Sequence, residues 1–140
     1  MKYLLDTMVV SEPTKRKRES RVIEWLKEHA AFSAVSILAL GEVERGIIKL
    51  PDGVRRKRLM TWFVAMADGM DNEGRVIGIS RELMSSWAVT YNREERLTKR
   101  KPPFVDTLMA ATAEVHGMTM VTRNVKDFPT GLPVINPWDA

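Results

Sequence analysis

The chain has 140 residues, of which 44% are hydrophobic and 29% are charged. This length and composition predict a single globular domain over residues 1–140, and they exclude a disordered or collagen-like chain. Cysteine is absent and only two histidines occur, His29 and His116, which excludes disulfides, thiolate catalysis and cysteine-ligated or histidine-rich metal sites. The formal net charge of +4 is compatible with a nucleic-acid partner.

No apolar run approaches the ~20 residues that a membrane span requires. Asp6 stands where a secretory signal needs an apolar stretch. The sequence therefore predicts a soluble, cytoplasmic protein that does not associate with membranes.

Short apolar segments alternate with longer segments of helical periodicity. Strands are expected at 3–5, 32–35, 75–79, 118–121 and 133–135, and helices at 20–30, 37–50, 54–70, 81–91 and 104–116. This order predicts an α/β fold with a mainly parallel sheet of four to five short strands. Ligands bind beyond the carboxyl ends of such strands, which draws attention to Asp6 and to the polar segment 122–127.

Two aspartates stand at positions that a metal site would use. Asp6 directly follows the first strand, where a turn residue or a helix cap is the ordinary explanation. Asp106 lies in the first turn of its helix, where an acid also complements the helix dipole. It is in line with the small residues Ala110 and Ala113, so a second element packed on that face would hold Asp106 at the top of a crevice.

The helix at 37–50 offers two glutamates. Helical periodicity groups Glu44 with the apolar positions Ile37, Leu40, Ile47 and Ile48. It groups Glu42 with Leu38, Arg45 and Lys49. Periodicity alone weakly favours Glu44 as a functional acid, and a salt-bridged surface role is the alternative for both. Asn124 and Asp127 follow a strand, and both residue types are also common in turns.

Acids that converge at strand ends repel one another and raise each other's pKa values. A hard divalent cation removes this repulsion, and oxygen ligands without cysteine suit Mg²⁺ or Mn²⁺. A carboxylate-held ion of this kind acts on phosphate esters. The sequence thus indicates a metal-dependent reaction at a phosphodiester.

Four motifs and a tail, at 4–13, 41–47, 106–113, 121–128 and 136–138, resemble those of PIN-domain ribonucleases. The likeness is greatest to VapC-type toxins of type II toxin–antitoxin systems, including the FitB-like branch, and it runs over nearly the whole chain. In this resemblance the acid of the second motif is Glu42 and not Glu44. Two departures occur: Met8 replaces a common asparagine, and Asn124 replaces an aspartate found in some relatives.

The resemblance implies a three-layer α/β/α PIN fold and an endoribonuclease in which a Mg²⁺- or Mn²⁺-activated water hydrolyses RNA. The residues it implies are Asp6, Glu42, Asp106, Asn124 and Asp127 for catalysis, Asp6, Glu42, Asp106 and Asp127 for metal binding, and Thr7 and Thr122 for substrate positioning. Either Asn124 or Asp127 would complete the site.

The resemblance also implies partners. These are a homodimer, a VapB-like antitoxin whose C-terminal segment covers the site, and operator DNA bound only through the antitoxin. Basic runs occur at 15–18, 55–58 and 99–101, and solvated surface is the ordinary explanation for each. The first and third flank the proposed acids in sequence and are candidate contacts for an RNA backbone. Two other functions stay open. One is a catalytically weakened module that binds RNA or acts in an antitoxin–DNA repressor complex, and the other is a metal-dependent phosphatase or DNA nuclease.

Overall fold

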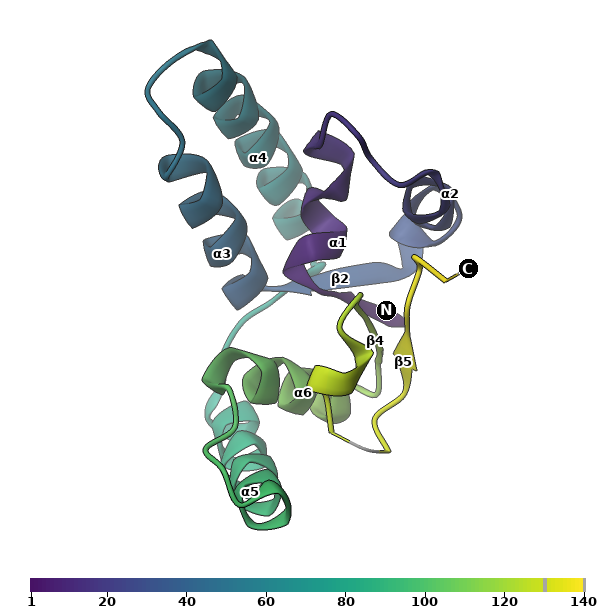
Figure 1. Cartoon of the computed structure of the whole chain (residues 1–140), viewed down its shortest axis with the longest axis vertical. Coiled ribbons are helices and arrows are strands. Elements are labelled where there is room, and N and C mark those ends of the chain that lie inside the picture. The colour runs from purple at the N-terminus through teal and green to yellow at the C-terminus, as the bar shows by residue number, and fades with distance from the viewer. Residues whose placement is uncertain (130, 140) are drawn as a thin grey trace.

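The computed structural model describes residues 1–129 and 131–139, and it places helices on both faces of a sheet (Figure 1). The strands are β1 (Tyr3–Leu5), β2 (Ser33–Ser36), β3 (Val76–Ile77), β4 (Thr119–Val121) and β5 (Val134–Ile135). Within the described residues they form one five-stranded parallel sheet in the order β3-β2-β1-β4-β5. The predicted α/β class and the parallel sheet are therefore confirmed.

The helices are α1 (Thr7–Ser11), α2 (Ser20–His29), α3 (Ile37–Ile48), α4 (Val54–Asn72), α5 (Arg81–Thr98) and α6 (Phe104–His116), with 3-10 turns at Glu12–Thr14, Ala30–Phe32 and Val125–Asp127. Two bounds differ clearly from the prediction, since β3 is shorter and α5 is longer. The unpredicted helix α1 has five residues, too few for a periodic pattern. None of the described helices combines the length and apolar character needed to cross a bilayer.

Alternation along the central strands builds the three layers. Leu4, Ala34 and Met120 lie in a buried cluster with α6 residues on one face of the sheet. Their neighbours Leu5, Val35 and Val121 lie in a second cluster with residues from α1 to α4 on the other face. Both faces of a parallel sheet are covered in this way, as its two-sided apolar strands require.

Helix α6 is enclosed on two sides. Met109, Ala110 and Ala113 pack toward the sheet, whereas Leu108 and Ala111 pack with Leu83 of α5. The small alanines let both neighbours approach closely, and this confirms the prediction that the second face is covered. The start of α6 is thereby fixed between two layers.

Helix α3 buries a different face from the one that periodicity indicated. Its buried residues are Ala39, Leu40, Val43 and Ile47. Glu44 is exposed, and Ile37 and Ile48 beside it are 46% and 51% exposed. The prediction that Glu44 intrudes on the buried face is wrong, because two isoleucines taken as core residues face outward.

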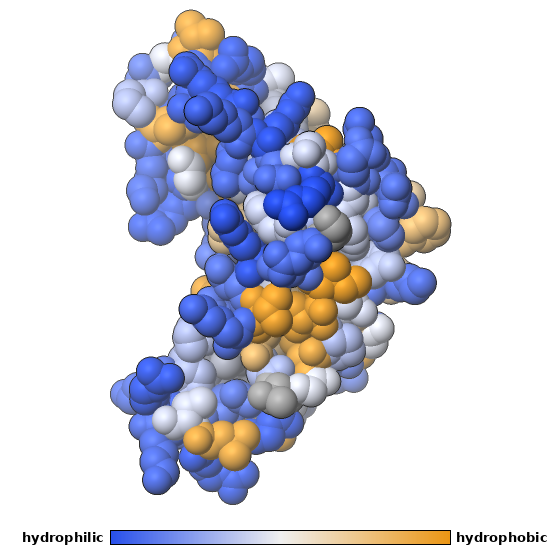
Figure 2. Space-filling view, turned by 45° about the vertical axis from the view of Figure 1, so that its right-hand side comes forward, coloured by the Kyte–Doolittle hydropathy of each residue, from blue (hydrophilic) through white to orange (hydrophobic). Residues whose placement is uncertain are grey.

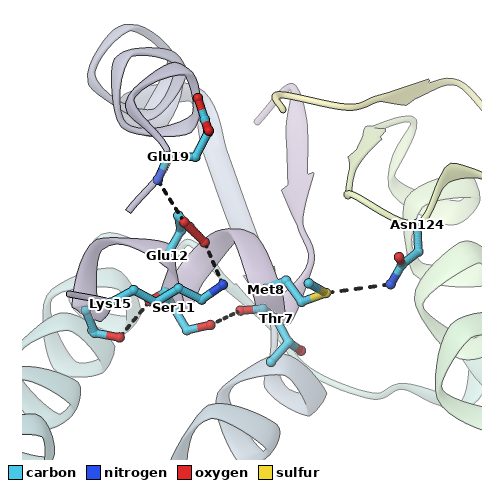
Figure 3. A network of polar contacts seen from close by, with 8 residues as sticks. Thr7, Met8, Ser11, Glu12, Lys15, Glu19 and Asn124 are labelled. Atoms are coloured by element: carbon cyan, nitrogen blue, oxygen red, sulfur yellow. Dashed lines mark hydrogen bonds and ion pairs between the residues drawn. The ribbon is translucent and has the colours of Figure 1, made fainter. Parts of the chain in front are cut away.

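A buried carboxylate joins the end of α1 to the start of α2. Glu12 is 2% exposed, and its Oε2 accepts the backbone N–H of Glu19 at 3.0 Å. The Lys15 ammonium lies 2.9 Å from Oε1 as an ion pair without hydrogen-bond geometry. Figure 3 shows Glu12 between these two partners. This carboxylate therefore fixes the path of the chain away from the end of α1.

We expect Glu12→Ala to lower the free energy of unfolding by about 1–3 kcal/mol, because the Glu19 N–H loses its acceptor and a cavity is left. Urea denaturation measures the change. The control is Glu24→Ala, since Glu24 is exposed and pairs with Lys27 only at 3.5 Å; a surface pair of this kind contributes about 0.5 kcal/mol or less. Equal losses in both variants would contradict this role for Glu12.

Candidate active site

Asp6 is held at the carboxyl edge of the sheet by donors on both of its oxygens. It directly follows β1, and Thr122 directly follows the neighbouring strand β4. The backbone N–H of Thr7 donates to Oδ1 at 2.8 Å, and the Thr122 hydroxyl donates to Oδ2 at 2.7 Å. Asp6 is thus the N-cap of α1, and its carboxylate has a fixed orientation.

Glu42 reaches the same region from α3. The Thr7 hydroxyl donates to its Oε1 at 2.6 Å, so Thr7 connects the first two acids through its backbone and its side chain. The hydroxyls of Thr7 and Thr122 are both engaged with carboxylates in this structure. Sequence reasoning placed these threonines near substrate but missed their contacts with the acids. For Thr7 the available signal was its position directly after Asp6.

Asp106 is half-buried in the first turn of α6. Its pKa is raised from the ordinary 3.8 to about 6, first by burial and then by the negative charges of Asp6, Asp127 and Glu42, in that order of effect. Three acids from other segments are therefore near enough to act on Asp106. Of the four acids that the sequence proposed as metal ligands, Asp6, Glu42 and Asp127 thus lie within electrostatic range of the fourth, Asp106.

Asn124 lies beside this group on the loop after β4. Its backbone N–H donates to the Thr122 hydroxyl at 3.1 Å, and its side-chain amide lies 3.6 Å from the sulfur of Met8. Figure 3 shows Met8 and Asn124 directed toward each other. The two positions that depart from the family pattern are therefore in contact.

The acids fit a hard divalent cation in chemistry and charge. Four carboxylates from different segments supply oxygen donors. A cation would offset the repulsion that, after burial, contributes to the raised pKa of Asp106. Across residues 1–129 and 131–139, however, no three His, Cys, Asp or Glu side chains already stand in a metal-ligand arrangement.

Two cavities adjoin the acids. One, of about 300 Å³, lies among α1, α3 and α4 and is lined by Thr7, Ser11, Thr14, Glu42, Val43, Gly46, Ile47, Leu50, Arg55, Leu59 and Trp62. The other, of about 330 Å³, includes Asp127 in its wall. Figure 2 shows the surface hollowed on one side between a lobe with α3 and α4 and a lobe with α5 and α6.

Comparison with known proteins identifies the family. No protein-family model matches the chain. The plasmid stability protein StbB of Pseudomonas syringae pv. tomato is 30% identical over 98% of this chain and 99% of its own length. The VapC ribonuclease Y4jK of Sinorhizobium fredii is 28% identical over 97% of both chains, and the toxin FitB of Neisseria gonorrhoeae is 29% identical over 96% of this chain and 97% of its own.

The chain belongs to the VapC-type family of PIN-domain toxins. A solved FitAB complex bound to a DNA fragment contains a chain that matches with a TM-score of 0.87 and 26% identity, over 97% of this chain and 95% of that one. A DNA-bound VapBC complex from Salmonella typhimurium matches with a TM-score of 0.75 and 19% identity over 98% of both chains, a likeness of fold alone. The expected PIN-like fold is confirmed.

The raised pKa of Asp106 makes the stability of the metal-free protein depend on pH. The unfolded chain releases this proton near pH 3.8 and the folded chain near 6. Between these values the folded state binds more protons, so the free energy of unfolding falls as pH rises. We expect Asp106→Asn to flatten this slope and to stabilise the protein at pH 7 by about 1 kcal/mol, a value discounted for screening at a half-exposed carboxylate.

Urea denaturation in EDTA between pH 4 and 8 measures the effect. Glu44→Gln is the matched control, since it removes an exposed acid from α3 outside the cluster. Parallel pH profiles for the wild type and Asp106→Asn would overturn this account of Asp106.

Proposed function

We propose that this chain, as a single PIN domain, is a metal-dependent endoribonuclease toxin that a cognate antitoxin neutralises. The observation that carries the proposal is the gathering of acids at the ends of β1 and β4, where burial and three negative charges raise the pKa of Asp106 to about 6. Acids with a purely structural role gain nothing from being placed where they repel one another, whereas acids that bind a cation have to lie close together. An RNA target is consistent with the cytoplasmic location that the sequence predicts.

The proposed ligands of Mg²⁺ or Mn²⁺ are Asp6, Glu42, Asp106 and Asp127. The bound ion supplies an activated water and neutralises charge that develops on the phosphate. Thr122 and Thr7 hold the carboxylates of Asp6 and Glu42 in fixed orientations, and through them they position the substrate. Asn124 adds a carbonyl oxygen beside the four acids without adding a fifth negative charge to their repulsion.

RNA is the proposed substrate for two reasons. One relative that matches nearly the whole chain is named a VapC ribonuclease. The basic run 99–101 also lies in the connection that leads into α6, whose first turn carries Asp106. Cations at this place hold a phosphate backbone against the acids and give binding that depends on salt.

We expect purified, antitoxin-free protein to cut total RNA into discrete products with Mg²⁺ or Mn²⁺, and EDTA to abolish the cleavage. Asp6→Asn should lower the rate at least about 100-fold, since even residues that only support a metal ligand cost 10–100-fold. Glu44→Gln is the control, because Glu44 is exposed on the helix that carries Glu42, and it should keep wild-type activity.

The other functions predict different outcomes. Intact RNA in every lane from folded protein favours the weakened binding module, and the Asn124→Asp and Met8→Asn variants then test whether these departures silence the site. Cleavage of DNA or of phosphate monoesters in preference to RNA favours the nuclease or phosphatase alternative. Growth arrest that survives Asp6→Asn would count against a toxin that acts by cleavage.

The groove among α1, α3 and α4 is the proposed antitoxin site. The matched structures include FitAB and VapBC complexes, each with DNA bound. The groove holds apolar side chains such as Leu59 and Trp62, and it reaches Glu42. An amphipathic antitoxin segment laid there covers the acids. We also propose a homodimer and a toxin–antitoxin hetero-oligomer, with operator DNA bound through the antitoxin.

We expect Trp62→Gln to weaken the affinity for the cognate VapB-like antitoxin at least about tenfold, because a large aromatic side chain in a groove is a common binding hot spot. RNA cleavage should stay near the wild-type rate. Calorimetry measures the affinity, and Val64→Gln is the control, since Val64 is 48% exposed on the same helix and does not line the groove. Unchanged affinity in Trp62→Gln would exclude the groove as the docking site.

A further inference from the structure

The cavity beside Asp127 has a position and a size that suit one unit of a polymer substrate. It measures about 330 Å³ and lies between the end of α5, the connection to α6 and the segment after β4. Small-molecule sites begin at about this volume. Asp127 and Thr107 line it, so it opens next to the proposed catalytic acids.

Its walls combine cations with apolar surface. Arg100, Lys101 and Lys126 line the cavity, and in the described part of the chain none of the three forms an ion pair. Pro103 and the buried Phe128 supply an apolar wall. A nucleotide presents the matching groups, since its phosphate attracts cations and its base and ribose pack on apolar surface.

Glu94 supplies a hydrogen-bond acceptor to the same cavity. Its side chain is 17% exposed, and its Oε1 lies 3.9 Å from the Nε of Arg93, beyond hydrogen-bond distance. A carboxylate accepts hydrogen bonds from the amino groups of bases and has no donor for a carbonyl. Uracil has no amino group, and its one ring donor, the N3–H, lies between two carbonyl oxygens that repel a carboxylate. This acceptor therefore favours a base that carries an amino group over uracil.

We propose that this cavity binds the nucleotide next to the scissile phosphate, with Arg100 and Lys126 on its phosphate groups and Glu94 selecting a base that carries an amino group. The inference rests on the proposed ribonuclease function and deepens it by naming a specificity-determining residue. Asp127 then lies between the cavity and the other acids, and the bound nucleotide places its phosphate at that edge.

A cleavage profile tests the choice of base. The wild type cuts a random-sequence RNA pool with Mg²⁺, and sequencing of the products gives the base frequencies on either side of each cut. We expect uracil to be depleted about tenfold at one of the adjoining positions, and Glu94→Gln to remove the depletion because a carboxamide can also donate to a carbonyl. Glu95→Gln is the control, since Glu95 is next on the same helix and does not line the cavity.

A binding measurement keeps the inference separate from the ribonuclease proposal. Pentaribonucleotides that differ only in their central base are titrated into the Asp6→Asn protein with Mg²⁺. We expect the Asp6→Asn protein to bind the pentanucleotide with central uracil more weakly than the others. This difference should disappear in Asp6→Asn/Glu94→Gln. In Asp6→Asn/Lys126→Gln, binding should be weaker for every central base and should depend less on salt. If the wild type does not cleave RNA but this binding pattern is observed, the ribonuclease proposal is contradicted and the nucleotide-binding inference is not. Equal affinities for all central bases, or a uracil depletion that survives Glu94→Gln, overturn the inference.

Discussion

The negative charge gathered at the carboxyl ends of β1 and β4 is the constraint on which the rest of the structure depends. In-register parallel strands place Asp6 and Thr122 side by side, and α3 and α6 bring Glu42 and Asp106 to the same edge. Hydroxyl donors from Thr7 and Thr122 stabilise two of the carboxylates. Asp106 has little such help, and its pKa is raised by its burial and, to a lesser extent, by the repulsion of the other acids.

The fold opposes that repulsion by holding the acids on rigid elements. The strand before Asp6 is buried on both faces, and α6 is enclosed between the sheet and α5 through its alanines. Glu12 fixes the chain path directly after α1. Burial of apolar surface stabilises the fold by about 25 cal/mol per Å². This stabilisation holds in place acids that would move apart if the elements carrying them were loosely packed. Rigid support of this kind also keeps the carboxylates at one edge of the sheet.

The features of the fold and site that could be predicted are those that depend on local sequence patterns. The alternation of strands and helices gave the fold class, and the strand–acid junction located Asp6. Glu42 was found only through the family resemblance, because exposed Ile37 and Ile48 mislead a periodicity argument on α3. Helix α1 is too short for any periodicity. The Met8–Asn124 contact joins residues 116 positions apart, so it depends on tertiary structure that local patterns do not contain.

That contact explains how two departures from the family pattern coexist. An asparagine at position 124 removes one negative charge from a crowded site, which lessens repulsion in the metal-free protein and weakens attraction for a cation. A thioether is a weak acceptor, so Met8 leaves the Asn124 amide loosely held, 3.6 Å away. On the proposed function, Asp127 supplies the charge that Asn124 lacks. Asp127 is exposed and also lines the nucleotide cavity, so metal binding and nucleotide binding would meet at one carboxylate.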